Sequence, residues 1–271
     1  MRNLISIIAL SAALVSGPVA AETYKLSMLP RYFPERLTAM MTPLVEYLGK
    51  ATGKDIQLVL TKNFEDYAAR VKSGEIAIGY ENPVVFVNVS DRHEALAIAV
   101  AGKDGTRFRG IVITRPDSGI KGLADLAGKE VLMVGETSAG GFLSQKASLA
   151  KAGIALDRIK LTQAADNRQE NVIIGVSIGD ADAGFIRESA LHVADQYIQP
   201  GSVVTIAETE WLPNWAFSVD RSMPDELKVA LQQAVVSLSA DDPVMKAIGM
   251  TGFDKADDSA YADLREVMKN Q

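Results

Sequence analysis

Two strand-like segments of this sequence end in small polar residues that begin a helix. Residues 76–80 are apolar and lead into Glu81, Asn82 and Pro83, and residues 131–135 lead into a Glu-Thr-Ser-Ala-Gly-Gly segment at 136–141. The first amides of a helix lack intrahelical partners and lie at the positive end of its dipole, so a helix start is suited to anion binding. Two such junctions, over fifty residues apart, predict an anion site in a cleft between two lobes.

The first junction carries a well-specified helix start. Asn82 is a favoured N-cap residue, and Pro83 is favoured at the first helical position. The same pattern also fits an ordinary helix start without a ligand. Tyr80 either packs in the core or closes over a ligand, and its hydroxyl needs a partner in both cases.

At the second junction, two glycines replace better helix formers. Thr137 or Ser138 is expected to cap the helix, and Gly140 and Gly141 leave its first amides open to close approach. Each glycine costs roughly 1 kcal/mol of helix stability relative to alanine, which we attribute to ligand access rather than to packing. We therefore predict ligand contacts at four successive residues, Ser138, Ala139, Gly140 and Gly141. The segment lacks the Gly-Lys-Ser/Thr ending of a phosphate-binding loop.

Charged residues near the junctions leave two interpretations open. Glu81 and Glu136 either stabilise the helix dipoles or face the cleft, where they would favour a ligand with an ammonium group or a protonated oxygen. Arg109 and Arg187 follow predicted strands and are expected to face the opening. Each arginine either binds an oxyanion with its guanidinium fork or pairs with a surface carboxylate.

The sequence favours binding over catalysis. It shows no evident pair of nucleophile and general base. His93 and His192 are isolated, and cysteine is absent, so we predict no metal site and no cofactor. Trp215 either forms a wall of the cleft or packs in the core. An exported enzyme on the same scaffold is the less favoured alternative.

Strand patterns alternate with helical patterns along most of the chain, which predicts an α/β fold with largely parallel sheets. Residues 22–109 and 206–271 are expected to form one lobe, and residues 110–205 a second lobe inserted into it. The chain would then cross twice between the lobes, which permits a hinge. The main elements expected are strands at 24–29, 56–60, 76–80, 110–114, 131–135, 183–186 and 216–219 and helices at 34–52, 64–72, 141–152 and 170–178.

The first residues and the charge indicate an exported protein. Residues 1–21 have a basic start, a short apolar run and small residues at the end, as a secretory signal peptide does. Without cysteine there is no acceptor for a lipoprotein anchor, so we expect a free periplasmic protein and a monomer. The net charge of −6 argues against nucleic acid or an anionic membrane as a partner.

Together with Asp66-Tyr67-Ala68, Pro213-Asn214 and the segment 124–129, the two junctions make the chain resemble the phosphate, phosphite and phosphonate substrate-binding proteins of ABC importers. That resemblance implies a type II periplasmic binding protein with two α/β lobes. It also implies a small anionic or zwitterionic ligand and a membrane permease as partner. The tyrosine that matches Tyr67 lines the site in the family.

The chain departs from the family at the second junction. Family members have a Ser-Thr-Ser-Gly segment where this chain has residues 138–141, and some have a histidine where this chain has Gln169. Fewer side-chain donors leave more of the binding to backbone amides. We therefore expect a solute-binding protein that captures a small oxoanion or phosphonate-like ligand for an ABC permease. The alternative is a ligand sensor that signals to a sensor kinase.

Overall fold

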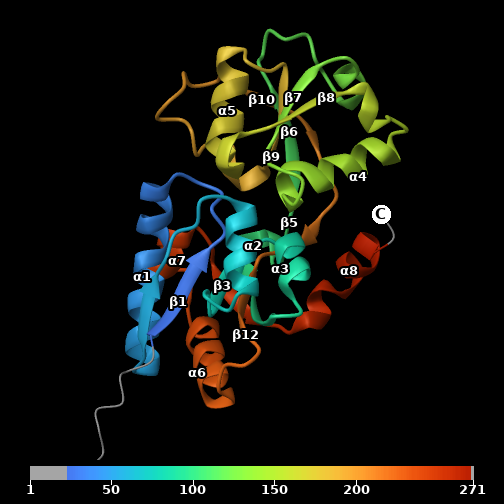
Figure 1. The fold of residues 1–271 in the computed structure, drawn as a ribbon. Coiled ribbons are helices and arrows are strands. Elements are labelled where there is room, and N and C mark those ends of the chain that lie inside the picture. Colours follow the sequence, from blue (N-terminus) through green and yellow to red (C-terminus); the bar gives the residue numbers. More distant parts are fainter. Residues whose placement is uncertain (1–22, 270–271) are drawn as a thin grey trace, which may run out of the picture.

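The computed structural model describes residues 23–269, so the expected signal peptide at 1–21 lies outside the described residues. Figure 1 shows two lobes stacked along the long axis of the molecule, with the short strand β5 (Arg107–Phe108) between them. Within the part of the chain that the structure describes, no helix is long and apolar enough to cross a membrane.

The first lobe is built on a six-stranded sheet with the order β13-β4-β12-β3-β1-β2. β1 pairs in parallel with β2 and with β3, whereas β12 and β13 run antiparallel to their neighbours. The strands are β1 (Thr23–Met28), β2 (Asp55–Leu58), β3 (Ile78–Glu81), β4 (His93–Val100), β12 (Ala216–Asp220) and β13 (Gly252–Lys255).

Helices cover both faces of this sheet (Figure 1). α1 packs against α6 and α7, and α3 packs against α2 and α8. α1 buries Leu37, Met41, Leu44 and Leu48 on one stripe and ends at Gly53, whose left-handed backbone suits glycine. The helices are α1 (Pro34–Thr52), α2 (Phe64–Lys72), α3 (Pro83–Val89), α6 (Asp225–Val236), α7 (Pro243–Ile248) and α8 (Ala262–Lys269).

The second lobe has a five-stranded sheet with the order β10-β6-β9-β7-β8. Its strands are β6 (Gly110–Thr114), β7 (Glu130–Met133), β8 (Lys160–Gln163), β9 (Ala183–Arg187) and β10 (Val204–Glu208). A π-helical turn at Ala139–Leu143 leads into α4 (Ser144–Lys151), and α5 (Gln169–Ile178) precedes β9. β5 pairs with β11 (Leu212–Pro213) to form a two-stranded ribbon where the chain crosses between the lobes.

The predicted α/β class with two lobes is confirmed, but the expected predominance of parallel pairing is wrong. Parallel pairing is confined to β3, β1 and β2 in one lobe and to β9, β7 and β8 in the other. The strands nearest the crossings, β6 and β12, are antiparallel because the chain enters each sheet from the opposite lobe.

β10 pairs with β6 as far as Glu208, so the return crossing begins after the predicted boundary at residue 205. β13 and α8 were not expected from the sequence pattern.

Candidate functional site

A small cavity lies between the two lobes, with about 230 Å³ of atom-free space that includes part of its opening to solvent. The first lobe contributes residues after β1 and β3, at the start of α2 and before β12. The second lobe contributes the turn at 138–140 and residues next to β9 and α5, while Phe108 comes from the crossing ribbon. The lining residues are Arg31, Phe64, Asn82, Phe108, Ser138, Ala139, Gly140, Gln169, Arg187 and Trp215.

Hydrogen bonds cross between the lobes around this cavity. They use three side-chain groups at or just before the starts of helices, together with backbone groups that include two in the loop after β1. The bonds are Asn82 Nδ2 to Thr137 O (3.2 Å), Phe64 N to Asn167 Oδ1 (2.9 Å), Gln169 N to Arg31 O (3.1 Å) and Phe33 N to Glu170 Oε1 (3.2 Å). The structure is therefore that of a closed cleft.

Arg31 contributes one buried guanidinium to the cavity wall. The residue follows β1, and only 2% of its surface is exposed. Its guanidinium carbon lies 4.5 Å from the ring centroid of Tyr32 and 4.4 Å from that of Trp215. Its Nε and Nη1 atoms have no hydrogen-bond partner. The aromatic rings hold the charge in place and leave these two donor atoms unused.

Arg187, at the end of β9, contributes a second buried guanidinium. Its Nη2 donates to Asn214 Oδ1 at 2.9 Å, and its guanidinium carbon lies 4.2 Å from the Phe108 ring centroid. Its Nε and Nη1 atoms have no hydrogen-bond partner. Burial, and then repulsion from Arg31, lower the pKa of Arg187 to about 9, so the guanidinium is still charged at neutral pH.

The cavity is electropositive and rich in hydrogen-bond donors. Among residues 23–269, neither Arg31 nor Arg187 forms an ion pair with a carboxylate. The Tyr80 hydroxyl and Asn214 Nδ2 are also buried without a partner, and burial raises the pKa of Tyr80 to about 12. Buried charges normally need a counter-charge. A bound anion would supply it, and would accept hydrogen bonds from the free nitrogen atoms of Arg31 and Arg187.

The first junction does not offer the open amides that the sequence predicted. Asn82 Oδ1 accepts from both Val84 N and Val85 N at 2.9 Å, and Phe86 N donates to Asn82 O. Pro83 has no amide hydrogen. The cap therefore consumes the donors at the start of α3, and the part of Asn82 that faces the second lobe is its Nδ2 group.

The second junction is capped at one amide, and its glycines have a packing reason. Ser138 Oγ accepts from Gly141 N at 3.1 Å. A Cβ on Gly140 would lie 2.8 Å from Phe108 Cε2, and a Cβ on Gly141 would lie 2.4 Å from Val134 Cγ2. The turn packs too closely on its neighbours for a side chain at either position, so the glycines have a packing reason beside the predicted ligand access, which stays a prediction.

This packing predicts that Gly141→Ala destabilises the ligand-free protein by about 1–3 kcal/mol, as overpacking does. Gly122→Ala is the matched control, because no atom lies within 4 Å of the position that its new methyl group would take, and its backbone is extended. We expect the control to change the free energy of unfolding by less than about 1 kcal/mol. Urea denaturation of the two variants measures the difference, and equal stabilities would contradict the packing argument.

Tyr67 and Glu81, both predicted to contact ligand, instead contact each other. The Tyr67 hydroxyl donates to Glu81 Oε2 at 2.6 Å, and both residues are fully buried beside Gly79 and outside the cavity lining. Burial raises the pKa of Glu81 to about 7. Glu136, at the second junction, is exposed. Neither carboxylate lines the cavity.

Arg109 does not reach the cavity either. Its guanidinium donates to Glu188 at 2.9 and 2.7 Å and pairs with Glu208, so it joins the end of β10 to the turn after β9. Of the two roles predicted for Arg109, the structure therefore shows pairing with a carboxylate. Asn82, Ser138, Ala139, Gly140 and Arg187 are the predicted contacts that line the cavity.

Sequence reasoning missed Arg31, Phe64, Phe108 and Asn214. Arg31 directly follows the first strand, in Leu29-Pro30-Arg31-Tyr32. β1 and β3 are parallel neighbours, so the residues after both strands lie at the same sheet edge. That adjacency was a usable signal for Arg31, because the end of β3 was already part of the predicted site.

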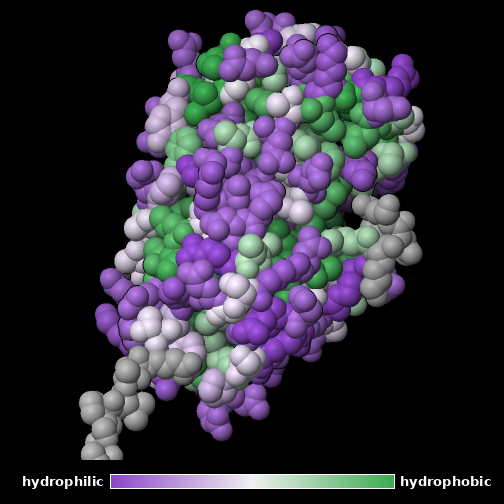
Figure 2. Space-filling model, in the orientation of Figure 1, coloured by the Kyte–Doolittle hydropathy of each residue, from purple (hydrophilic) through white to green (hydrophobic). Residues whose placement is uncertain are grey.

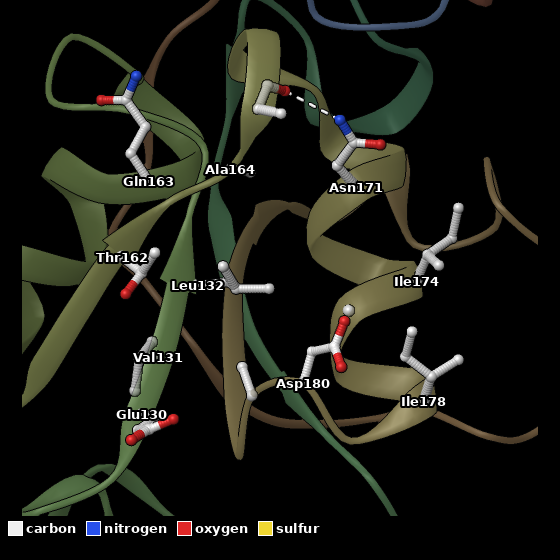
Figure 3. Close-up of a pocket in the computed structure, with 13 residues that line it drawn as sticks. Glu130, Val131, Leu132, Thr162, Gln163, Ala164, Asn171, Ile174, Ile178 and Asp180 are labelled. Carbon is white, nitrogen blue, oxygen red and sulfur yellow. Dashed lines mark hydrogen bonds between the residues drawn. The ribbon is translucent and has the colours of Figure 1, made fainter.

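A second hollow lies within the second lobe, between β7, β8 and α5 (Figure 3). Asn171 Nδ2 donates to Ala165 O beside it, and the acidic residues Glu130 and Asp180 line its other end. It shares no lining residue with the interlobe cavity, and its carboxylates would repel an anion. On the outer surface, hydrophilic residues predominate over the face drawn in Figure 2. No group of three His, Asp or Glu side chains suited to a metal ion occurs in the described range.

The chain resembles known proteins over most of its length. The model of the family described as "ABC transporter, phosphonate, periplasmic substrate-binding protein" matches residues 26–261. The phosphate-import protein PhnD of Mycolicibacterium smegmatis is 23% identical over 90% of this chain and 79% of its own length.

Solved structures share the fold at low identity. PhnD1 from Prochlorococcus marinus, in complex with methylphosphonate, superposes with a TM-score of 0.82 at 13% identity, covering 92% of this chain and 97% of that chain. A binding protein component of an ABC phosphonate transporter from Pseudomonas aeruginosa also has a TM-score of 0.82, at 15% identity over 92% and 86% of the two chains. A histidine kinase sensor domain is less similar, with a TM-score of 0.56 at 14% identity over 79% and 89%.

Proposed function

This chain belongs to the periplasmic substrate-binding proteins of phosphonate ABC transporters, and we propose that it closes on a small oxoanion held between Arg31 and Arg187. The family consists of substrate-binding transport proteins rather than enzymes. The ligand-bound protein would deliver its anion to an ABC permease. The sequence also predicts a monomer without a lipoprotein anchor, and this stays a prediction.

The observation that carries this proposal is the pair of buried guanidiniums without an ion-pair partner. Their four unpartnered nitrogen atoms belong to residues from different lobes. Two cations buried in one cavity repel each other, which opposes closure of the empty cleft. An oxoanion that accepts hydrogen bonds from both would favour the closed state by the difference between its affinities for the two states.

The cavity limits the size and the charge of the ligand. The free space between these walls is far smaller than the roughly 300–1,000 Å³ of a drug-sized site, so a small oxoanion suits it better than a nucleotide. Phe64, Phe108 and Trp215 supply apolar walls for a small substituent on the anion. A zwitterion is less suitable, because its ammonium group would find no carboxylate among the lining residues.

A thermal-shift panel tests the proposal. Sulfate, hydrogen phosphate, phosphite and methylphosphonate are compared, with chloride as the control ion. A ligand at 100 times its dissociation constant adds about 2.7 kcal/mol of stability, which corresponds to a rise in melting temperature of about 5–10 °C for a chain of this size. If no oxoanion raises the melting temperature beyond the effect of chloride, the proposed function is wrong.

The second candidate is a ligand sensor in a signalling system. The structural likeness to a histidine kinase sensor domain favours it, but that likeness shows the fold alone. Stimulation of ATP hydrolysis by a reconstituted permease and its ATPase, on addition of the ligand-bound protein, would favour transport over sensing.

A further inference from the structure

The starts of α1 and α5 meet across the interlobe cleft, and neither has a side-chain cap of its own. Glu170 lies in the first turn of α5, in the second lobe. Its Oε1 accepts from the amide of Phe33, the residue before α1 in the first lobe, at 3.2 Å. A helix start is the positive end of the helix dipole and stabilises a nearby carboxylate. One carboxylate therefore serves two helix starts that belong to different lobes.

The ring of Phe33 is also held by the second lobe. The guanidinium carbon of Arg168 lies 5.3 Å from the centroid of this ring, and the ring of Tyr197 packs against it edge to face at a centroid distance of 5.8 Å. Both kinds of contact are attractive. We call Phe33, Arg168, Glu170 and Tyr197 the Phe33 latch. Its contacts join the two lobes, so they exist only while the cleft is closed.

The Phe33 latch lies outside the anion site. None of its four residues lines the interlobe cavity. Of the four interlobe bonds described above, the bond from Phe33 N to Glu170 is the one in which neither residue is a lining residue. The latch can therefore change the free energy of closure without changing a contact between the cavity wall and a bound anion.

Closure changes the surroundings of the Glu170 carboxylate. In the closed structure Glu170 is only 1% exposed, and its Oε2 has no hydrogen-bond partner. Burial raises the pKa of Glu170, while its bonds to backbone amides and the charges of Arg36 and Arg31 act against this rise. Opening the cleft breaks the bond from Phe33 and returns both groups to water. The carboxylate thus has a different free energy in the two states, which is required of any group that shifts the equilibrium between them.

We propose that Glu170 is a positioning residue that holds the cleft closed: its carboxylate, carried by the second lobe, binds the start of α1 in the first lobe and slows the reopening of the anion complex. The inference rests on the proposed function and concerns the closure of that same site. Arg31 and Arg187 repel each other in the closed state, and the Phe33 latch opposes that repulsion from outside the cavity.

Glu170→Asp tests the latch with little change to the fold. Aspartate keeps a negative charge in the first turn of α5, but its carboxylate is one methylene group shorter and is withdrawn from Phe33 N. Sulfate, hydrogen phosphate and methylphosphonate are the probes. Calorimetry gives the dissociation constants, and stopped-flow tryptophan fluorescence gives the rates, because Trp215 lies in the cavity wall.

For each anion that the wild-type protein binds, we expect Glu170→Asp to raise the dissociation constant roughly tenfold, as the loss of a hydrogen bond to a charged group does. The anion binds to the open protein, so the loss should come from faster dissociation, with a nearly unchanged association rate. The factor should be the same for every anion, because the latch does not contact the ligand. The melting temperature of the ligand-free protein should stay within about 4 °C of the wild type.

Glu136→Asp is the matched control, because Glu136 is exposed in the same lobe. We expect its dissociation constants to stay within about twofold of the wild type. Tyr197→Ala is a second variant of the latch, at a side chain that is 54% exposed. It should bind each anion roughly two- to fivefold more weakly, and it decides if Glu170→Asp does not fold.

The outcomes separate the two proposals. Binding by Glu170→Asp that is as tight as that of the control overturns the latch and leaves the proposed anion site standing. A loss that depends on which anion is bound would make Glu170 a ligand contact, and a loss accompanied by a lower melting temperature beyond that range would make it a structural residue; each overturns the latch. Binding of none of the three anions by the wild-type protein overturns the proposed function and the latch with it.

Discussion

Replacing Arg187 by methionine is expected to weaken oxoanion binding at least roughly 30-fold while leaving the ligand-free protein as stable as the wild type or more stable. The loss follows from removal of one of two buried cations that would face the ligand, since truncating one member of a buried charge pair costs about 2–5 kcal/mol. The stability gain follows from removing a charge that has no carboxylate partner. Methionine retains contact with the Phe108 and Trp215 rings, so we expect a gain on the order of 1–3 kcal/mol.

Calorimetric titration with the oxoanion that gives the largest thermal shift, together with urea denaturation, measures both effects. Arg109→Met is the matched control, because Arg109 lies outside the cavity lining and pairs with Glu188 and Glu208. We expect its anion affinity to stay within about threefold of the wild type. An Arg187→Met protein that binds the anion as well as the control does would exclude Arg187 from the site.

A combination of lost affinity and retained stability distinguishes a binding residue from a structural one. A residue that only supports the fold would lose both together. The lowered pKa of Arg187, about 9, already indicates that the folded protein bears a cost for this charge. Such a cost is common at binding sites, where the ligand offsets it.

The sequence located the edge of each sheet where the site lies, but not the groups that carry its charge. Helix-cap residues were the visible signal, and Asn82 and Ser138 do cap their helices. The oxygen that makes these residues good caps is also the acceptor that occupies the helix amides. Residue type alone cannot separate an amide that is capped from one that is open to a ligand.

The burial of Arg31 was hard to predict for a physical reason. An arginine next to proline at the end of a strand normally lies on the surface, because burying a guanidinium without a partner is unfavourable. Here Trp215 comes from a segment far along the chain, and its ring covers the guanidinium. That contact depends on how the second crossing returns to the first lobe, which single-sequence patterns do not contain.

Glu81 shows the opposite error. It is a charged residue predicted to contact the ligand, but it is buried outside the lining of the cavity. It lies between Tyr80 and Asn82 at the end of β3 and accepts from Tyr67, while Gly79 leaves the room that this pair requires. The alternation of side chains along a strand turns Glu81 to the opposite face from its neighbours. The pair therefore supports the strand end from which Tyr80 and Asn82 reach the cleft.

We expect Glu81→Gln to change the pH dependence of stability by about 3 kcal/mol. Burial raises the pKa of Glu81 from 4.5 to about 7, so the folded protein keeps a proton between these pH values that the unfolded chain releases. This group's contribution to stability is therefore fully present below pH 4.5 and is lost as the pH rises to 7. Glutamine cannot ionise, so the free energy of unfolding of the variant, minus that of the wild type, should rise by about 3 kcal/mol across the same window.

In the wild-type protein, the titration of His93 masks this effect. Burial lowers the pKa of His93 from 6.5 to about 4, so its contribution to stability increases as the pH rises from 4 to 6.5. His93 and Glu81 thus act in opposite directions over most of the same range, and their contributions nearly cancel. Subtracting the two proteins' curves removes His93, and every other group common to both, from the comparison.

Urea denaturation at intervals between about pH 4.5 and 8 provides the two curves. Glu75→Gln is the control, because Glu75 lies at the surface and its pKa is lowered to about 2 by pairing with Arg70 and Lys25. Its titration falls below the window, so its difference curve should be flat there. A Glu81→Gln difference curve that is equally flat would mean that Glu81 ionises at its ordinary pKa. In that case Glu81 would be a charged carboxylate beside the cleft at neutral pH.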